Sequence, residues 1–303
     1  MTNDRLDIEK NDYSNLRVLH PFRLLMCGDW HGNLRAAKAA IALADRRGAD
    51  GIVHVGDLGW HWNGVHAKTF DLPLEEELAK RDIFMVWADG NHDNHDLLRE
   101  LPVRDDGFVE CSPHLFWSPR ANIWNWAGRE FGTLGGAFSV DHEYRKNGWD
   151  LWKGTEEVQP EDIAHLGFGF LDVLITHDVP ADVPVRADMR LPPRDHQRSS
   201  VSRSLLRQAV ENTRPELVFS GHWHQRLTYD IALTEREGTS RVEVLDMDDT
   251  YGNVVILDLD DLKVTAPPLG WQDWTRRDER KERSARAREA FHQAQHSATE
   301  QGK

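Results

Sequence analysis

Short apolar runs recur along the chain, and each of them ends in Gly, Asp, Asn or His. Five such runs stand out, namely RLLMCGD from residue 23, GIVHVGD from residue 51, IFMVWADGN from residue 83, VLITHD from residue 173 and LVFSGH from residue 217. Continuous runs of β-branched and aromatic residues of this length are typical of strands buried on both faces. The pattern therefore predicts five buried strands whose carboxyl ends carry polar side chains.

Helical patterns separate the first three runs. Residues 33–48 read NLRAAKAAIALADRRG, which is rich in Ala and ends in Gly, and residues 74–82 read LEEELAKRD. A further helix is expected around Arg203 and Arg207. Strands that alternate with helices indicate an α/β sheet, in which ligands bind at the carboxyl ends of the strands.

Two other stretches predict β-hairpins. Residues 122–141 contain IWNWAG and REFGTLGG on either side of Gly128, and RLTYDIAL from residue 226 is followed by RVEVLDM from residue 241. Alternating apolar and polar residues around a turn signal are typical of paired antiparallel strands. We expect these hairpins to belong to a second sheet.

Both ends of the chain differ from the part between them. Residues 1–20 are polar and are predicted to be an N-terminal extension, whereas residues 271–303 are charged and alternate in sign at helical spacing. Residues 21–270 are then the main domain. The C-terminal tail is expected to be either a solvated helix or a segment that binds a protein partner or another subunit.

The composition narrows the choice of partners. The formal net charge of -14 argues against a broad surface for nucleic acid, because nucleic-acid binders usually carry a basic stripe, although a local basic channel stays open. The first 15 residues contain no apolar run as long as that of a signal peptide, and no segment approaches the length of a membrane span, so we expect a cytoplasmic protein with no membrane partner. The 2 cysteines form no CxxC motif and are expected to be buried or free thiols.

Seven potential metal ligands follow the apolar runs directly. They offer carboxylate, amide and imidazole donors without thiolate, a set that favours Mn, Fe or Zn. One such fragment could merely cap a turn, but five of them in one chain indicate a functional site. Two divalent ions about 3.5–4 Å apart can clamp a phosphoryl group and hold a hydroxide that attacks it in line. The seven residues are Asp29, His31, Asp57, Asn91, His177, His222 and His224.

These motifs resemble the pattern of the calcineurin-like metallophosphoesterase superfamily, which reads D-x-H, G-D, G-N-H-D/E, a lone His and G-H-x-H. The resemblance spans residues 23 to about 259, and the segment GGAFSVDHEYRKNGWDLW from residue 135 is similar to one in uncharacterised actinobacterial and actinophage members. It implies two facing mixed β-sheets flanked by helices, a four-layer sandwich. It further implies that Asp29, His31 and His224 bind one ion, that Asn91, His177 and His222 bind the other, and that Asp57 bridges the two.

One position departs from this pattern. Many relatives, notably the Ser/Thr protein phosphatases, read G-D-x-x-D, and the second Asp supports their catalytic His, but Trp60 occupies that position here. The Arg that follows in those phosphatases is also absent, which argues against a protein phosphatase. The resemblance implies that His92 is catalytic and protonates the departing oxygen. The alternative is a structural His92 that only orients Asp57. Its neighbouring candidates for support are Asp93, His95 and Asp96.

The segment GGAFSVD supplies the candidates for substrate binding. Asp141 and Arg145 are predicted to contact the substrate. Ser139 and Asp141 could pass for a nucleophile and its base, but the G-x-S-x-G elbow is absent and the metal site already supplies a nucleophile. A tight approach of the backbone near the pocket is the expected role of the two glycines.

Arginines and tryptophans near the motifs leave two interpretations open. The arginines between residues 186 and 207 could bind the part of a substrate that is not transferred, although most are expected to be surface residues. Trp30, Trp60 and Trp62 lie within or beside the metal motifs, where an indole could stack on a base or sugar. Packing is the more common role of a Trp.

The sequence predicts a dinuclear metal-dependent phosphohydrolase that cleaves a small phosphomonoester or phosphodiester by attack of a metal-bound hydroxide. A DNA or RNA nuclease of the same superfamily is the alternative, disfavoured by the acidic net charge. A non-catalytic interaction scaffold is the third interpretation, and it should have lost ligands, whereas all seven are present.

Overall fold

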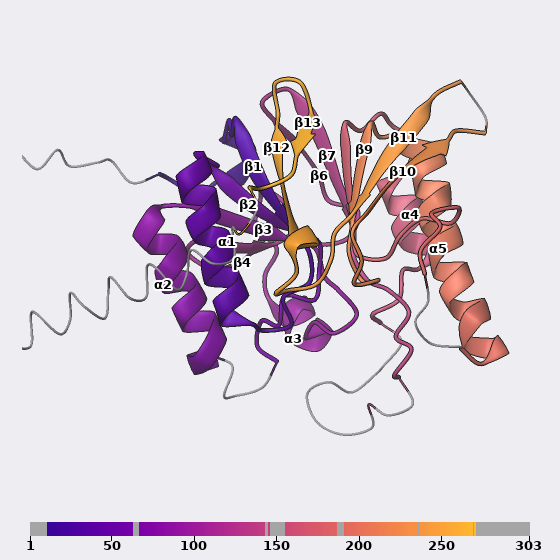
Figure 1. Ribbon diagram of the computed structural model, residues 1–303, viewed down its shortest axis with the longest axis horizontal. Helices are drawn as coiled ribbons and strands as arrows, with labels where there is room; N and C mark the ends of the chain where they lie inside the picture. Colours follow the sequence, from indigo (N-terminus) through magenta and orange to yellow (C-terminus); the bar gives the residue numbers. More distant parts are fainter. Residues whose placement is uncertain are drawn as a thin grey trace, which may run out of the picture.

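Two mixed β-sheets form the centre of the computed structural model, which describes residues 11–62, 67–142, 145, 155–186, 191–234, 237–268 and 270 (Figure 1). The C-terminal tail predicted over residues 271–303 lies outside the described residues.

The first sheet has seven strands in the order β13-β12-β1-β2-β3-β5-β4. Its parallel centre consists of β1, β2, β3 and β5, while β12, β13 and β4 add antiparallel pairs at the two edges. The strands are β1 Arg23–Cys27, β2 Gly51–His54, β3 Phe84–Trp87, β4 Val109–Ser112, β5 Leu115–Trp117, β12 Val254–Asp258 and β13 Lys263–Thr265.

The second sheet has six strands in the order β10-β11-β9-β8-β7-β6. β7, β8, β9 and β11 run parallel to one another, and β6 and β10 pair antiparallel at the edges. The strands are β6 Ile123–Trp126, β7 Arg129–Leu134, β8 Val173–Thr176, β9 Leu217–Ser220, β10 Leu227–Ala232 and β11 Thr239–Val244.

Helices cover the outer faces of both sheets, which gives four layers (Figure 1). One apolar cluster joins α1 and α2 to the first sheet, another fills the space between the two sheets, and a third joins α4 and α5 to the second sheet. Neighbouring residues of a strand point to opposite faces, so Leu24 packs between the sheets while Leu25 packs under the helices. The helices are α1 Leu34–Arg47, α2 Leu72–Arg81, α3 His95–Glu100, α4 Pro160–Leu166 and α5 Pro193–Thr213, with short helical turns η1 Leu16–Val18, η2 Ala67–Asp71 and η3 Tyr251–Asn253.

This arrangement confirms the expected α/β fold of two mixed sheets flanked by helices. The five buried runs form strands and the predicted helices form α1, α2 and α5. Gly48 ends α1 in the left-handed conformation, at φ 61°, where its lack of Cβ removes the steric penalty. The hairpins β6–β7 and β10–β11 belong to the second sheet, as predicted, but VLITHD and LVFSGH join that sheet as well, as β8 and β9.

The described start of the chain, which belongs to the predicted N-terminal extension, packs onto the domain. Tyr13 and Leu16 are buried in the core between the sheets. The Tyr13 hydroxyl donates to the carbonyl of Asp82 at 2.8 Å, and the Trp126 indole donates to the carbonyl of Leu16 at 2.7 Å. The polar composition of this segment gave no sign of these contacts, and the domain boundary at residue 20 stays a prediction.

Candidate metal centre

The polar side chains that follow β1, β2, β3, β8 and β9 meet at the carboxyl ends of the strands of both sheets. Asp29 follows β1, Asp57 follows β2 and Asn91 follows β3, all from the first sheet. His177 follows β8 and His222 follows β9, from the second sheet. Because parallel strands end at the same edge, the fold brings residues that are nearly 200 positions apart in the sequence into contact.

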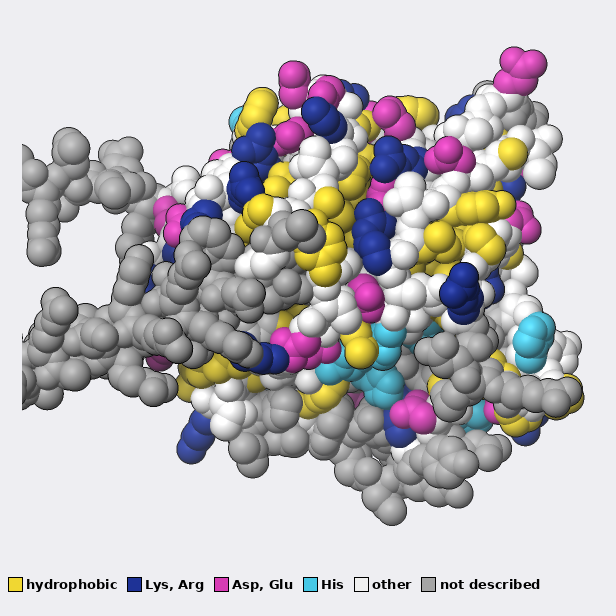
Figure 2. All heavy atoms as spheres, viewed as in Figure 1, with side chains coloured by type: hydrophobic (Ala, Val, Ile, Leu, Met, Phe, Trp, Pro, Cys, Tyr) yellow, Lys and Arg dark blue, Asp and Glu magenta, His cyan; other side chains and the backbone are white. Residues whose placement is uncertain are grey.

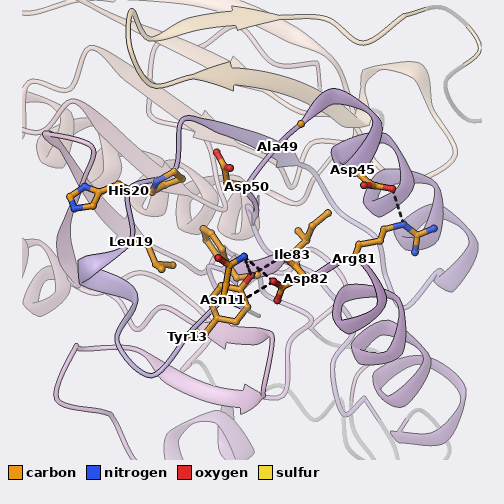
Figure 3. Close-up of a pocket in the computed structure, with 13 residues that line it drawn as sticks. Asn11, Tyr13, Leu19, His20, Asp45, Ala49, Asp50, Arg81, Asp82 and Ile83 are labelled. Atoms are coloured by element: carbon orange, nitrogen blue, oxygen red, sulfur yellow. Dashed lines mark hydrogen bonds and ion pairs between the residues drawn. The ribbon is translucent and has the colours of Figure 1, made fainter. Parts of the chain in front are cut away.

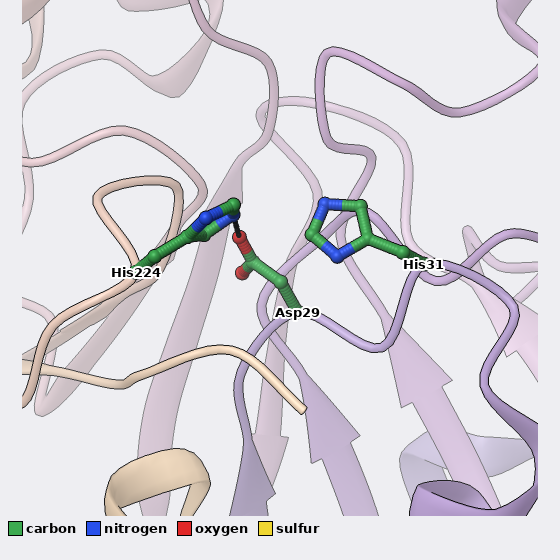
Figure 4. A group of neighbouring side chains, drawn as sticks. All are labelled: Asp29, His31 and His224. Carbon is green, nitrogen blue, oxygen red and sulfur yellow. Dashed lines mark ion pairs between the residues drawn. The ribbon is translucent and has the colours of Figure 1, made fainter. Parts of the chain in front are cut away.

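One group of potential ligands consists of Asp29, His31 and His224 (Figure 4). One donor atom from each of them lies within 4.8 Å of the others, and Nε2 of His224 is 3.2 Å from Oδ2 of Asp29. Asp29 is fully buried and also accepts a hydrogen bond from the backbone N–H of His222 at 3.1 Å. A buried carboxylate between two imidazoles provides a suitable donor set for a divalent ion.

A second group consists of Asp29, Asp57 and His177, all of them buried. Oδ2 of Asp57 is 3.4 Å from Nε2 of His31 and also 3.4 Å from Nε2 of His177. One carboxylate oxygen therefore faces an imidazole from each of the two predicted ligand sets. This is the geometry that a bridging carboxylate needs.

Asn91 and His222 lie beside His177, although His222 belongs to neither of the two groups of potential ligands described above. Nε2 of His177 is 3.0 Å from Oδ1 of Asn91, and the His177 and His222 rings are 5.2 Å apart between centroids. Nδ1 of His177 lies 3.0 Å from the carbonyl oxygen of Val55, to which a proton on Nδ1 can be donated. Such a contact fixes the ring so that Nε2 faces the centre.

The backbone of these loops is strained in a way that brings their side chains inward. His31, Asp57, His222 and His224 all have positive φ values, between 46° and 65°, which non-glycine residues rarely adopt. Glycines admit the close approach of neighbouring loops. A Cβ on Gly90 would lie 2.1 Å from Oδ1 of Asp57.

Electrostatics couple the carboxylates to the imidazoles. Burial lowers the pKa of His177, but the carboxylates of Asp57, Asp29 and Asp93 together outweigh burial and raise this pKa to about 10. Burial also acts to lower the pKa of His31, but the Asp57 carboxylate acts in the opposite direction, and the pKa is raised to about 9. In turn, burial disfavours the charge of Asp57, but His177 and His92 hold its pKa well below the ordinary value. The centre therefore concentrates carboxylate charge that either protons on the imidazoles or bound cations can balance.

Asp93 ties two of the loops together. Its carboxylate accepts hydrogen bonds from the backbone N–H groups of Asp57 at 3.0 Å, Gly90 at 2.7 Å and Gly59 at 3.2 Å. Burial and the nearby Asp57 raise the pKa of Asp93 to about 7. The hydrogen bonds described for the Asp93 carboxylate are thus made to the loop backbone. The sequence had suggested Asp93 as a support for His92.

His92 lies beside the centre and next to Asp141. Its backbone N–H donates to Oδ1 of Asp57 at 2.8 Å, and its Nε2 is 4.0 Å from Oδ2 of Asp141. Asp141 also pairs with Arg145 at 3.3 Å. Trp60, in the position where many relatives have an Asp, is buried against the His61 and Trp87 rings. Sequence proximity did not reveal the contact between Asp141 and the His92 ring, since 49 positions separate the two residues.

The predicted substrate residue Arg145 is buried and has protein partners. Its guanidinium donates to both carboxylate oxygens of Glu156, at 2.8 and 2.7 Å, and to the carbonyl of Asn91 at 3.3 Å. The carboxylate of Asp141 is 42% exposed. The substrate roles of Asp141 and Arg145 stay predictions.

The other arginines and the tryptophans divide between packing and the site. Arg203 donates to the carbonyls of Val179, Pro180 and Val183, and Arg207 pairs with Asp182 at 3.1 Å. Arg203 and Arg207 therefore stabilise the loop that contains residues 179–183 and do not face the centre. Trp30 and Trp60 are buried, as packing predicts, whereas the Trp62 ring lies 6.0 Å from His31 and 6.4 Å from His92.

Histidine side chains gather on one face of the molecule, close to acidic side chains (Figure 2). The backbone N–H of Asp248 donates to the carbonyl of Asp29 at 2.7 Å, and the Asp248 charge contributes to the raised pKa of His31. With Asp141 on the side of His92, carboxylates stand on two sides of the centre.

A separate pocket of about 310 Å³ lies at the other end of the sheet (Figure 3). It is lined by residues that precede β2 and β3, including Asp50, Asp82 and Ile83. None of the seven predicted ligands lines it. Within the described part of the chain, no helix combines the length and the apolar character that crossing a membrane requires.

Comparison with known proteins yields one family and a set of distant structural neighbours. The profile described as calcineurin-like phosphoesterase matches residues 22–226. The protein TT1561 of Thermus thermophilus aligns with a TM-score of 0.50 and 17% sequence identity, over 81% of this chain and 97% of that chain. A dimetal phosphatase from Danio rerio aligns with a TM-score of 0.44 and 12% identity, over 78% of this chain and 92% of that chain. No curated protein matches the sequence. At this identity, the similarity to TT1561 supports the fold alone.

Proposed function

Because the chain belongs to the calcineurin-like phosphoesterase family, we propose that it is a dinuclear metal-dependent hydrolase of a small phosphate ester. The observation that carries this proposal is the position of Oδ2 of Asp57, 3.4 Å from the imidazoles of both His31 and His177. A carboxylate that served only to hold a loop would not need an imidazole on either side.

In this proposal the seven residues hold two divalent ions of Mn, Fe or Zn. Bound ions of this kind would clamp the phosphoryl group and supply an acidified water for in-line attack. The protein holds the donors in place: Val55 fixes the His177 ring, the His222 backbone holds Asp29, and Asp93 holds the loop of Asp57.

His92 is proposed to protonate the departing oxygen. Its backbone N–H donates to Oδ1 of Asp57 at 2.8 Å, which holds the ring beside the centre, and its Nε2 lies 4.0 Å from Oδ2 of Asp141. An alkoxide leaves poorly without a proton, and a positioned imidazole supplies one.

A small ester fits the surroundings better than a nucleic acid. Asp141 and Asp248 place negative charge on two sides of the centre, and the chain carries a formal net charge of -14. Both features disfavour the approach of a polyanion. A nuclease is the second candidate, which Trp62 beside His92 favours because an indole can stack on a base. The cytoplasmic location and the partner role of residues 271–303 remain predictions from the sequence.

Hydrolysis assays on purified, metal-depleted protein test the proposal. Addition of Mn²⁺ should restore cleavage of p-nitrophenyl phosphate or bis-p-nitrophenyl phosphate, and Asp57→Asn should stay inactive under the same conditions. Labelled single-stranded and double-stranded DNA and RNA should stay uncut where the small esters turn over. If no ester is cleaved with Mn, Fe, Co, Ni or Zn at any pH, the proposed hydrolase is wrong. Cleavage of nucleic acid in preference to small esters would establish the nuclease instead.

A further inference from the structure

The segment Gly135–Asp141 follows β7 and is fixed against the end of β3. The backbone N–H of Gly136 donates to the carbonyl of Asp89 at 2.6 Å. A Cβ on Gly135 would lie 2.4 Å from Oδ1 of Asp89, so only glycine allows this approach. Asp89 is itself buried and held by Arg120 at 2.8 Å. A buried ion pair with several hydrogen bonds thus holds the segment beside the residues that follow Asp89, namely Gly90, Asn91 and His92.

Ser139 in this segment is hydrogen-bonded to the Asn91 amide. Nδ2 of Asn91 donates to Oγ of Ser139 at 2.9 Å, and the two residues are only 2% and 1% exposed. The amide nitrogen is therefore engaged on one side, which leaves Oδ1 facing Nε2 of His177 at 3.0 Å. An amide in the flipped orientation would present N–H groups, which cannot bind a cation.

Asp141 ends the segment beside the His92 ring. Its Oδ2 is 4.0 Å from Nε2 of His92, and its Oδ1 is 3.3 Å from Arg145. Arg145 is anchored in turn by Glu156 and by the carbonyl of Asn91. The buried Arg145 guanidinium therefore holds one oxygen of the Asp141 carboxylate, while the other oxygen faces the His92 ring.

We propose that Gly135–Asp141 is the positioning element of the Asn91–His92 pair, with Ser139 fixing the donor oxygen of Asn91 and Asp141 orienting the ring of His92. Many relatives have an Asp at the position of Trp60, and that Asp supports their catalytic His. In this chain, Asp141 supports His92 instead. Ser139 and Asp141 each act through another side chain, so neither is a catalytic residue. The kinetic test of Asp141 rests on the proposed function, because it measures hydrolysis. The test of Ser139 measures metal binding and does not depend on turnover.

Titration of metal-free protein with Mn²⁺ tests Ser139. Ser139→Ala should weaken Mn²⁺ binding at the site that includes Asn91 by about 10–100-fold, the range found for residues that orient metal ligands. Ser118→Ala is the matched control, because the Ser118 hydroxyl accepts from the Asn122 amide at 3.2 Å and should leave Mn²⁺ binding unchanged. In an Asn91→Asp background, Ser139→Ala should cost little affinity, since a carboxylate presents an oxygen in either orientation. Unchanged binding in Ser139→Ala, or an equal loss in both backgrounds, would overturn this assignment.

Asp141→Asn tests the second contact. Both metal ions should be retained, while hydrolysis of an alkyl phosphate should slow by about 10-fold or more and that of a p-nitrophenyl ester should slow less, because only the alkoxide needs a proton to depart. His92→Ala should show the same pattern, and the double variant should be no slower than His92→Ala. Asp182→Asn, which removes a carboxylate paired with Arg207 at 3.1 Å, serves as the control of unchanged activity.

Histidine NMR gives a readout that needs no turnover. In the zinc-loaded protein labelled with ¹⁵N-histidine, the ring signals of His92, assigned with His92→Ala, should shift in Asp141→Asn and stay unchanged in Asp182→Asn. Unshifted His92 signals, or equal slowing of all esters, would show that Asp141 does not position the ring. If the wild-type protein hydrolyses no ester, the proposed function fails, while the Mn²⁺ titration and the NMR spectra still decide this inference.

Discussion

At the residue scale, neighbouring positions in the sequence have different physical roles. Asn91, His92 and Asp93 are consecutive, yet Asn91 faces His177, His92 faces Asp141, and Asp93 binds the backbone of the Asp57 loop. A substitution at each position should therefore fail in its own way.

Asp57 and His92 give the sharpest contrast. Asp57→Asn removes the charge of the proposed bridge, so metal content and hydrolysis should be lost together. His92→Ala should keep its metal ions and slow the hydrolysis of esters with poor leaving groups by about 10²–10⁴-fold, with a smaller effect on p-nitrophenyl esters. Metal analysis beside kinetics on both ester types checks this. Loss of metal in His92→Ala would instead mean that the imidazole is structural and orients Asp57.

His95 should make the folded state sensitive to acid. It is buried, its Nε2 lies 2.8 Å from the Gly90 carbonyl, and burial lowers its pKa from 6.5 to about 4 although Asp89 opposes this. The unfolded chain therefore takes up a proton at higher pH than the folded chain. The stabilisation is present above pH 6.5 and is lost as the pH falls towards 4, by up to about 3 kcal/mol.

Unfolding curves of His95→Gln check this sign. With a chelator present throughout, the wild type should lose more stability than His95→Gln between pH 6.5 and pH 4. His165→Gln, at an exposed position of α4, should follow the wild type. Parallel pH profiles of all three proteins would contradict the prediction.

At the element scale, the loops that follow the strands depend on close contacts between backbones. A Cβ on Gly221, directly after β9, would lie 2.2 Å from Oδ1 of Asp29. Gly221→Ala should therefore displace Asp29 and weaken metal binding by at least about 10-fold, with an overpacking cost of roughly 1–3 kcal/mol. Gly169→Ala, where a Cβ would meet nothing within 4 Å, is the control in calorimetric titration and thermal unfolding. Metal binding by Gly221→Ala at wild-type affinity would show that the Asp29 loop tolerates the displacement.

The sequence predicts elements better than it predicts their neighbours. Apolar runs revealed β1, β2, β3, β8 and β9 because burial on both faces leaves a continuous pattern. The pattern says nothing about which sheet a strand joins, and β8 and β9 pair with the hairpins rather than with β1 to β3. Leu16 likewise lies in a polar segment, and its burial depends on Asp106 and Trp126, which are about 100 residues away.

The same limit applies to the candidate site. Its seven residues could be selected from the sequence because each one follows a strand, but the partners that orient them come from other loops. Ser139 and Asp141 reach Asn91 and His92 only because Gly135 and Gly136 fit against Asp89. Such contacts depend on the packing of the two sheets, which residue spacing does not encode.

At the scale of the whole molecule, the candidate centre lies where the two sheets meet. Asp29, His31, Asp57 and Asn91 follow strands of the first sheet, while the three remaining histidines follow strands of the second. Ions bound by ligands from both sheets would connect the two sheets through metal–ligand bonds, which the apolar core between the sheets does not provide. The stability of the fold should therefore depend on the metal.

Thermal unfolding with and without a chelator tests this link. An ion that is free at about 100 times its Kd stabilises the folded state by roughly 2.7 kcal/mol, which corresponds to about 5–10 °C in Tm for a domain of this size. Removal of the metal should lower the Tm of the wild type by about this amount, and added Mn²⁺ should restore it. Asp57→Asn should unfold at one temperature under both conditions because its bridge is lost, whereas Asp182→Asn should respond as the wild type does. If the wild type binds two ions and its Tm nevertheless stays the same after their removal, the ions bind the folded chain no more tightly than the unfolded chain, and a metal centre that joins the two sheets is contradicted.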